Sequence, residues 1–187
     1  AKPWPVGDAP VAKFQAAAEA KLDRAALDKA VSAAFDEQNK GGYPDTRAIV
    51  VVQGGAIVAE RYAPGFDRNT ELLGWSASKS IMGTLVGLLV DDGVLKLDDP
   101  APVPEWRGAG DLRGKITLRQ LLTMSSGLSF TESYLSGNDS IKMLFEAGDM
   151  GALAAAQPLK HEPGTNWSCS SGTTNILSRI VFHATGG

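Results

Sequence analysis

The strand signal in this sequence is confined to one hairpin, and this limits what the chain can fold into. Residues 47–52 (RAIVVV) are rich in β-branched side chains, and Gly54 and Gly55 form a two-residue turn signal before a second extended run at 56–62 (AIVAERY). A lone hairpin is a poor sheet on which to pack several helices. We therefore predict an α+β fold, an antiparallel sheet flanked by a helical region, and expect residues 1–187 to form one incomplete domain.

Helical spacing of apolar residues marks most of the remaining chain. Asp23 can cap a helix, Gly93 can stop one in a left-handed conformation, and Thr117 can cap another. The small and aliphatic residues at 76–90 predict a buried helix, whereas the Pro, Gly and Asp residues at 98–114 predict a loop. One or two helices are predicted in residues 16–38, where Asp23 could start a second segment. The other predicted helices, in chain order, are residues 76–90, 117–122, 139–147, 151–157 and 173–183.

Composition excludes several classes of function. The formal net charge is −3 and no basic stripe is present, so no nucleic-acid partner is expected. A single cysteine, Cys169, forbids an internal disulfide, and the two histidines, His161 and His183, cannot build a metal cluster. The longest apolar run, 81–90, is too short to span a bilayer. We therefore predict no metal, no cofactor and no membrane span.

The N-terminus bears on location. Residues 1–5 (AKPWP) contain neither an initiator Met nor a signal-peptide core, which fits a processed start. A periplasmic or secreted location, with the signal peptide removed, is expected ahead of a cytoplasmic one.

Ser76 and Lys79 form the pattern with the clearest chemistry. Positions i and i+3 share one face of a helix, so the lysine nitrogen can reach the serine hydroxyl. A serine hydroxyl is a weak nucleophile that needs a nearby group to take its proton, and a desolvated lysine can do so. Unpaired N–H groups at the helix N-terminus would favour an oxyanion on an attacked carbonyl. A Ser-x-x-Lys spacing alone occurs on many surface helices, but here it opens an apolar helix after a hairpin.

Four segments in one order carry a family resemblance. They are residues 75–80 (WSASKS), 89–100 (LVDDGVLKLDDP), 116–128 (ITLRQLLTMSSGL) and 163–165 (PGT). Together they resemble the serine β-lactamase and penicillin-binding protein superfamily, in its class C-like branch, and within it the 6-aminohexanoate-dimer hydrolases and related esterases. The resemblance implies a β-lactamase/transpeptidase-like fold, of which this chain would be the N-terminal part, with Ser76 and Lys79 as catalytic residues.

The second catalytic element of that family departs from its pattern here. The resemblance expects Tyr-x-Asn or Tyr-x-Ser after the Pro-Gly-Thr turn, and this position holds Cys169-Ser170-Ser171. A thiol is shorter than a phenol and titrates at a lower pKa. Cys169 is therefore either an impairing Tyr-to-Cys change, a rearranged catalytic group or an inert buried side chain. Ser171 fits the third position and is expected to bind substrate or Lys79.

Tyr134 is a candidate substrate-binding residue. The resemblance to the nylon-oligomer hydrolases places a tyrosine in this loop in contact with the substrate amide, although an exposed loop tyrosine is equally ordinary. Residues 136–138 (SGN) mimic the Ser-x-Asn element of class A β-lactamases and are a rival second motif, but Gly and Asn are also common turn residues.

The family's third element, a Lys-Thr-Gly or His-x-Gly strand, does not occur before Gly187. The resemblance implies that this strand completes the sheet and one half of the oxyanion hole, so a C-terminal remainder or a second chain is expected as partner.

The predicted function is that of a serine hydrolase that forms an acyl-enzyme on a small amide or ester substrate. A penicillin-binding D-Ala-D-Ala peptidase or β-lactamase would use the same residues. The alternative from another class of function is a catalytically impaired binder or sensor on the same fold.

Overall fold

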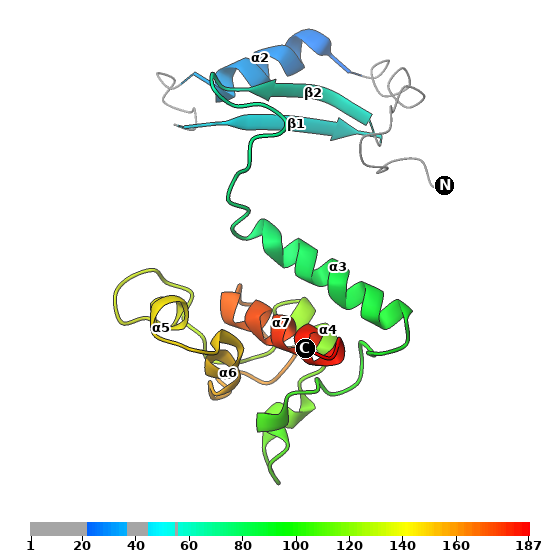
Figure 1. The fold of residues 1–187 in the computed structure, drawn as a ribbon, viewed down its shortest axis with the longest axis vertical. Coiled ribbons are helices and arrows are strands. Elements are labelled where there is room, and N and C mark those ends of the chain that lie inside the picture. Colours follow the sequence, from blue (N-terminus) through cyan, green and yellow to red (C-terminus); the bar gives the residue numbers. More distant parts are fainter. Residues whose placement is uncertain (1–21, 37–44, 55) are drawn as a thin grey trace. The chain divides into compact units, whose positions relative to one another are not determined.

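The computed structural model describes residues 22–36, 45–54 and 56–187 (Figure 1). The chain divides into two compact units, Ala1–Leu73 and Gly74–Gly187, and each is described by itself. The expected helical residues 16–21 and 37–38 lie outside the described residues, as does Gly55 of the turn. The single domain over residues 1–187 stays a prediction.

The first unit contains the predicted hairpin. Strand β1 (Ala48–Gln53) pairs antiparallel with β2 (Ala56–Tyr62), and the register shifts between Val51 and Val52. Such a shift places one extra residue in one strand and bends it locally. The hairpin prediction is confirmed.

Helix α2 (Arg24–Ala34) packs against this hairpin. It begins at Asp23, whose carboxylate accepts the N–H of Ala26 at 2.9 Å, so the predicted cap is confirmed. The Arg24 guanidinium donates to the carbonyl of Val58 in β2. Buried Ala56 and Val58 contact Leu22, Leu27 and Val51 in one small apolar cluster.

The second unit is helical. Its elements are α3 (Ala77–Asp91), the 3₁₀ turns η1 (Pro104–Trp106) and η2 (Leu112–Lys115), and helices α4 (Leu118–Leu122), α5 (Asp139–Phe145), α6 (Met150–Ala155) and α7 (Ser171–Ala184). The predicted helices are confirmed to within a few residues. The predicted loop at 98–114 differs in containing the two 3₁₀ turns. Thr117 and Gln120 form a reciprocal capping box at the start of α4, which explains why this five-residue helix begins there.

Helix α7 is the centre of the second unit, since it packs against α3, α4, α5 and α6. The indole of buried Trp106 donates to the carbonyl of Ala155 at 2.8 Å, which ties η1 to α6. The buried core residues are Val86, Ala101, Val103, Trp106, Ile116, Leu118, Leu121, Phe130, Met143, Ala154, Ala155, Ile176, Leu177 and Ile180.

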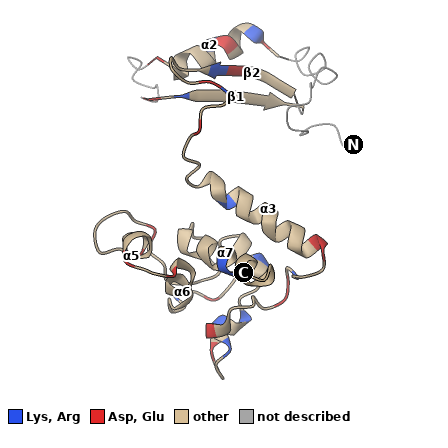
Figure 2. Ribbon diagram, in the orientation of Figure 1, with Lys and Arg blue, Asp and Glu red and all other residues tan. Residues whose placement is uncertain are grey.

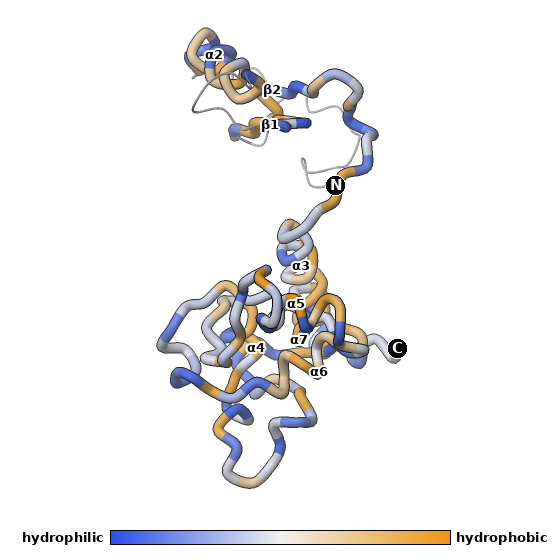
Figure 3. Tube along the Cα trace, turned by 90° about the vertical axis from the view of Figure 1, so that its left-hand side faces the viewer, coloured by the Kyte–Doolittle hydropathy of each residue, from blue (hydrophilic) through white to orange (hydrophobic). Residues whose placement is uncertain are grey.

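Helix α3 differs from the prediction in its burial. Its charged residues are Lys79 and Asp91, near its two ends (Figure 2), and hydrophobic stretches run along it (Figure 3). Val86 is fully buried, but Ile81 is 63% exposed and Leu88 is 57% exposed. Helix α7 covers only one face of α3, and α3 carries apolar residues on its other faces as well. Apolar composition predicted the helix correctly and overstated its burial.

Candidate functional site

Ser76 and Lys79 lie together at the N-terminus of α3. Ser76 is the N-cap residue, and the Nζ atom of Lys79 donates to the Ser76 Oγ atom at 3.1 Å. This is the distance expected for a hydrogen bond between the two side chains. Ser76 is exposed and Lys79 is half-buried, so the hydroxyl is accessible while the amine is held against the protein.

The turn that precedes α3 is tight. Trp75 adopts a φ of 43°, in the left-handed region that a bulky residue rarely enters. Its carbonyl accepts both the N–H and the hydroxyl of Ser78, at 3.1 and 2.6 Å, which holds this conformation. Strain of this kind needs such support from its surroundings.

The same turn decides which N–H groups remain for an oxyanion. The N–H groups of Ala77, Ser78 and Lys79 donate to the carbonyls of Gly74, Trp75 and Ser76. By contrast, the N–H of Ser76 has no acceptor among residues 22–36, 45–54 and 56–187. The expected pool of free N–H groups at this helix start is therefore reduced to the one on Ser76.

Ser171 meets Lys79 at the N-terminus of α7. The Lys79 Nζ atom donates to the Ser171 Oγ atom at 3.1 Å, the same distance that separates it from Ser76 Oγ. Ser170 caps α7 by accepting the N–H of Thr173 at 3.0 Å, and this fixes where Ser171 stands. Lys79 thus donates to one hydroxyl on each of two helices.

Glu132 is the site residue that the sequence analysis missed. Its Oε2 atom accepts the backbone N–H of Ser171 at 2.6 Å, and its Oε1 atom accepts the Ser171 hydroxyl at 2.7 Å. The Tyr134 hydroxyl donates to Oε1 as well, at 3.2 Å. A single glutamate in a loop carries no motif, so the sequence alone gave no signal for this carboxylate.

Packing brings the Glu132 loop to α7. Ser129 donates its N–H to the carbonyl of Pro158 at 2.8 Å, and Phe130 lies directly against α7 at Gly172. A Cβ atom at Gly172 would come within 2.6 Å of the Phe130 ring, so only glycine permits this approach. The close contact sets Glu132 beside the first residue of the helix.

Tyr134 is 59% exposed and reaches the site through Glu132. The pKa of its phenol is raised above the ordinary value, mainly because the hydroxyl donates to the Glu132 carboxylate and also because that carboxylate is negatively charged. Ser171 lowers the Tyr134 pKa by a smaller amount, and Cys169 raises it further. The hydroxyls of Tyr134 and Ser171 meet at the same oxygen of Glu132, and Cys169 lies two positions before Ser171 in the chain.

Cys169 itself is exposed, so it is not the buried inert side chain that was one of its three interpretations. Its thiol forms no hydrogen bond with any other residue that the structure describes. Hydrogen bonds link four of the expected site residues in the order Ser76, Lys79, Ser171 and, through Glu132, Tyr134. Cys169 does not take part in these hydrogen bonds.

The rival motif at residues 136–138 makes hydrogen bonds within its own loop. The Asn138 side-chain amide donates to the Ser133 hydroxyl and to the Leu135 carbonyl, both at 3.2 Å. Asn138 also precedes α5 as its N-cap residue. These contacts give the motif the turn role that its composition also allowed.

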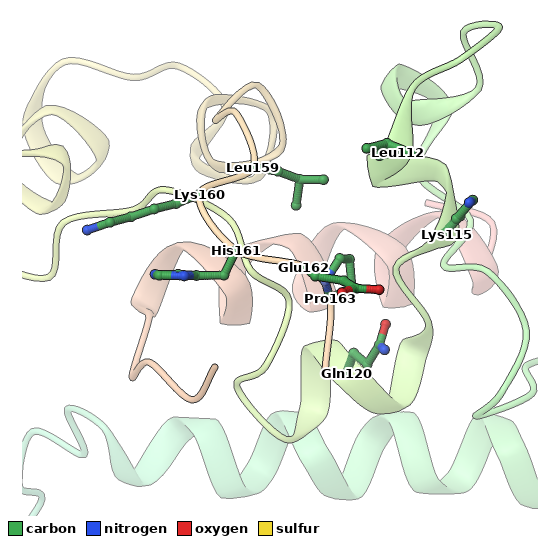
Figure 4. Close-up of a pocket in the computed structure, with 8 residues that line it drawn as sticks. All are labelled: Leu112, Lys115, Gln120, Leu159, Lys160, His161, Glu162 and Pro163. Atoms are coloured by element: carbon green, nitrogen blue, oxygen red, sulfur yellow. The ribbon is translucent and has the colours of Figure 1, made fainter. Parts of the chain in front are cut away.

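A separate cavity of about 520 Å³ lies away from Ser76 and Lys79. In Figure 4, Leu159 and Leu112 approach it from opposite sides, whereas the side chains of Lys160 and His161 extend away from Leu112 and Lys115. Its polar groups do not converge on one point, so we assign it no ligand. Within the described ranges, no three His, Cys, Asp or Glu side chains gather as a metal site, and no helix is long and apolar enough to cross a membrane.

Comparison with known proteins agrees with the resemblance seen in the sequence. The chain is 28% identical over 153 residues to the 6-aminohexanoate-dimer hydrolase of Paenarthrobacter ureafaciens, a match that covers 75% of this chain and 38% of that protein. A solved structure from Bacteroides dorei, provisionally named a beta-lactamase, matches with a TM-score of 0.65 and 28% identity, over 86% of this chain and 46% of the other.

A structure from Bacillus anthracis, provisionally named a 6-aminohexanoate-dimer hydrolase, matches with a TM-score of 0.58 and 23% identity, over 76% of this chain and 41% of the other. The chain thus spans less than half the length of these relatives. The β-lactamase-like α+β fold that the sequence predicted is confirmed. The family model named Beta-lactamase matches residues 28–187, and the chain therefore belongs to the beta-lactamase family, within the superfamily of serine β-lactamases and penicillin-binding proteins.

Proposed function

We propose that this protein is a serine hydrolase that forms an acyl-enzyme on Ser76. The observation that carries the proposal is the 3.1 Å distance between Lys79 Nζ and Ser76 Oγ at the start of α3. A positioned amine beside a serine hydroxyl is the arrangement that nucleophilic catalysis requires. The proposed mechanism needs no metal and no cofactor.

In the first half-reaction, Ser76 Oγ forms a bond to the substrate carbonyl carbon and its proton passes to the neutral amine of Lys79. The carbonyl electron pair moves to the oxygen, which can be stabilised by the N–H of Ser76, a group without an acceptor among the described residues. The pair then returns, the bond to the leaving amine or alcohol breaks, and the leaving group takes the proton. In the second half-reaction, water attacks the acyl ester, Lys79 takes a proton from that water, and Ser76 leaves and recovers the proton.

The substrate class we propose is a small amide or ester, with 6-aminohexanoate oligomers as the first compounds to test. The reason is the identity of 28% to a relative that is named a 6-aminohexanoate-dimer hydrolase. Exposed Tyr134 is proposed to contact the substrate, because its hydroxyl donates to the same Glu132 oxygen as the Ser171 hydroxyl, which in turn accepts from Lys79. Specificity depends on the pocket walls, so β-lactams and D-Ala-D-Ala peptides belong in the same panel.

The test is incubation of the full-length protein with p-nitrophenyl acetate, followed by intact mass and by release of p-nitrophenol. Turnover that is lost in Ser76→Ala supports the hydrolase. The 6-aminohexanoate dimer, a cephalosporin and a D-Ala-D-Ala peptide are then compared by kcat/KM. Absence of both an adduct and turnover with all four compounds would sink the proposal.

A second candidate function is an impaired, acylatable sensor. Cys169 favours it, since this exposed thiol stands where the family resemblance expects a tyrosine and forms no hydrogen bond with the described site residues. Such a protein would hold a stoichiometric adduct on Ser76 without releasing it. The persistence of that adduct over hours, measured by intact mass, separates the sensor from the enzyme.

A further inference from the structure

Three hydrogen-bond donors converge on the carboxylate of Glu132, and two of them belong to Ser171. The Ser171 N–H and hydroxyl donate at 2.6 and 2.7 Å, and the Tyr134 hydroxyl donates at 3.2 Å. Glu132 is half-buried, so these contacts are partly withdrawn from water. Hydrogen bonds to an ionised group are stronger than those between neutral groups, and this carboxylate fixes both polar groups of one residue.

The direction of these bonds determines what Ser171 can do for Lys79. An ionised carboxylate can only accept, so the single hydroxyl proton of Ser171 is committed to Glu132. The oxygen of Ser171 is then left as an acceptor, and it accepts from Lys79 Nζ at 3.1 Å. Without Glu132, the Ser171 hydroxyl could turn and point its proton at the lysine nitrogen instead.

This orientation matters to the neutral amine that the proposed mechanism needs. A neutral lysine has two protons and one lone pair. If one proton is held by Ser171 Oγ, the nitrogen is fixed so that its lone pair can face the Ser76 hydroxyl, 3.1 Å away. If Ser171 donated, it would occupy the lone pair that must take the Ser76 proton.

The segment that carries Glu132 is itself anchored. The Thr131 N–H donates to the carboxylate of Asp139 at 2.8 Å, and the Thr131 carbonyl accepts from the buried Ser140 hydroxyl at 3.3 Å. Both backbone polar groups of the preceding residue, Thr131, are thus tied to the start of α5. Glu132 therefore extends from a fixed backbone, as expected of a residue that sets the geometry of others.

We propose that Glu132 is a positioning residue of the Ser76 and Lys79 pair, acting through the hydroxyl of Ser171. The inference rests on the proposed function, because it concerns the rate at which Ser76 is acylated. It predicts that Glu132 and Ser171 act as one unit, so that removing either removes the effect of both.

The experiment is a double-mutant cycle on the acylation rate of full-length protein, with Glu132→Ala, Ser171→Ala and the double variant. Each single change is expected to slow acylation about tenfold, the scale of a lost hydrogen bond to a charged group, with little change in KM. In the Ser171→Ala background, Glu132→Ala should cost less than twofold more. The proposal would be overturned if the rate losses of the two single variants multiplied in the double variant, or if the variants raised KM without slowing acylation.

Two further variants separate positioning from folding. Glu132→Gln keeps the shape and one acceptor, and is expected to fall between wild type and Glu132→Ala while melting at the wild-type temperature. Glu146→Gln is the matched control, since this glutamate is exposed and has no side-chain hydrogen bond among the described residues, and its acylation rate should not change. Acylation that survives Ser76→Ala would reject the proposed function. If acylation depends on Ser76 but the rate losses of Glu132→Ala and Ser171→Ala multiply in the double variant, only the role of Glu132 is rejected.

Discussion

Lys79 Nζ lies 3.1 Å from Ser171 Oγ, although the two residues are 92 positions apart in the chain. The contact joins the N-terminus of α3 to the N-terminus of α7, two helices that pack together in the core of the second unit. Ser76 and Lys79 are brought together by one helical turn, but the second hydroxyl reaches the lysine only through tertiary packing. The proposed site therefore depends on the α3 and α7 contact as much as on the Ser-x-x-Lys spacing.

Replacing Ser76 by Ala is expected to abolish acylation and to leave the fold nearly intact. Ser76 is exposed and makes no side-chain cap, so the change removes the hydroxyl and almost no packing. Intact mass after p-nitrophenyl acetate treatment and thermal melting measure the two effects. Ser80→Ala is the control, as an exposed serine one turn along the same helix. Labelling that persists without the Ser76 hydroxyl would refute its role as nucleophile.

Replacing Lys79 by Ala is expected to slow acylation at least about a hundredfold, the scale of losing a positioned proton acceptor. The change also removes the donor to Ser76 and Ser171, so the serine hydroxyl loses its only amine neighbour in the described site. Stopped-flow measurement of the p-nitrophenol burst gives the rate. An unchanged burst rate would point to a different base.

The sequence predicted the secondary structure well because its signals are local. Asp23 and Thr117 cap the helices that they were expected to cap, and Gly93 adopts a φ of 73° after α3. The turn glycines and β-branched runs predicted the hairpin for the same reason. Burial of α3 was predicted less well, because an apolar helix does not reveal which of its faces a neighbour covers.

For the candidate site, sequence analysis predicted the residues that belong to a recognisable motif. Ser76 and Lys79 are adjacent because of helical spacing, and the family resemblance supplied Ser171 and Tyr134. The contact of Glu132 with Ser171 could not be predicted, because it depends on Phe130 lying against Gly172 and on the anchoring of Thr131. The contact between Glu132 and Ser171 joins residues 39 positions apart, and the anchor from Thr131 to Asp139 joins residues eight positions apart. Neither leaves a periodic trace in the sequence.

Titration of Tyr134 tests the contact with Glu132 directly. The carboxylate stabilises the protonated phenol by accepting its hydrogen bond and disfavours the phenolate by its charge, so the pKa of Tyr134 is raised. Glu132→Gln should therefore lower the Tyr134 pKa toward the ordinary tyrosine value. The difference in ultraviolet absorbance between each protein and its Tyr134→Phe version isolates this one tyrosine. An equal or higher pKa in Glu132→Gln would contradict the hydrogen bond.

Gly127 tests the turn that precedes the Glu132 loop. Its φ is 78°, and an added Cβ atom would lie 2.3 Å from the carbonyl oxygen of His161. Gly127→Ala is expected to lower the free energy of unfolding by about 3 kcal/mol through strain and this clash. Gly137 is the matched control, since its φ is 84° with no atom within 4 Å of an added Cβ. Gly137→Ala should lower the free energy of unfolding by only about 1 kcal/mol. If urea denaturation gave the same decrease for Gly127→Ala and Gly137→Ala, the clash at Gly127 would be rejected.

Replacing Cys169 by Tyr tests whether the thiol limits the proposed hydrolysis. The family resemblance expects a phenol at this position, and a thiol is too short to span the same gap toward Ser76. Cys169 is exposed, so the larger ring can be accommodated without disturbing the core. If a missing hydroxyl limits turnover, Cys169→Tyr should raise kcat by about a hundredfold, within the range of general acid and base groups.

Cys169→Phe is the control for that substitution, because it adds the same ring without a hydroxyl and should leave kcat near the parent value. Both variants are compared with the parent on p-nitrophenyl acetate and on the 6-aminohexanoate dimer. A Cys169→Tyr protein no faster than the parent would show that the thiol is not a defect. We would then propose Cys169 as a native part of the site, and the pH dependence of its labelling by iodoacetamide, which measures the thiolate, would decide its role.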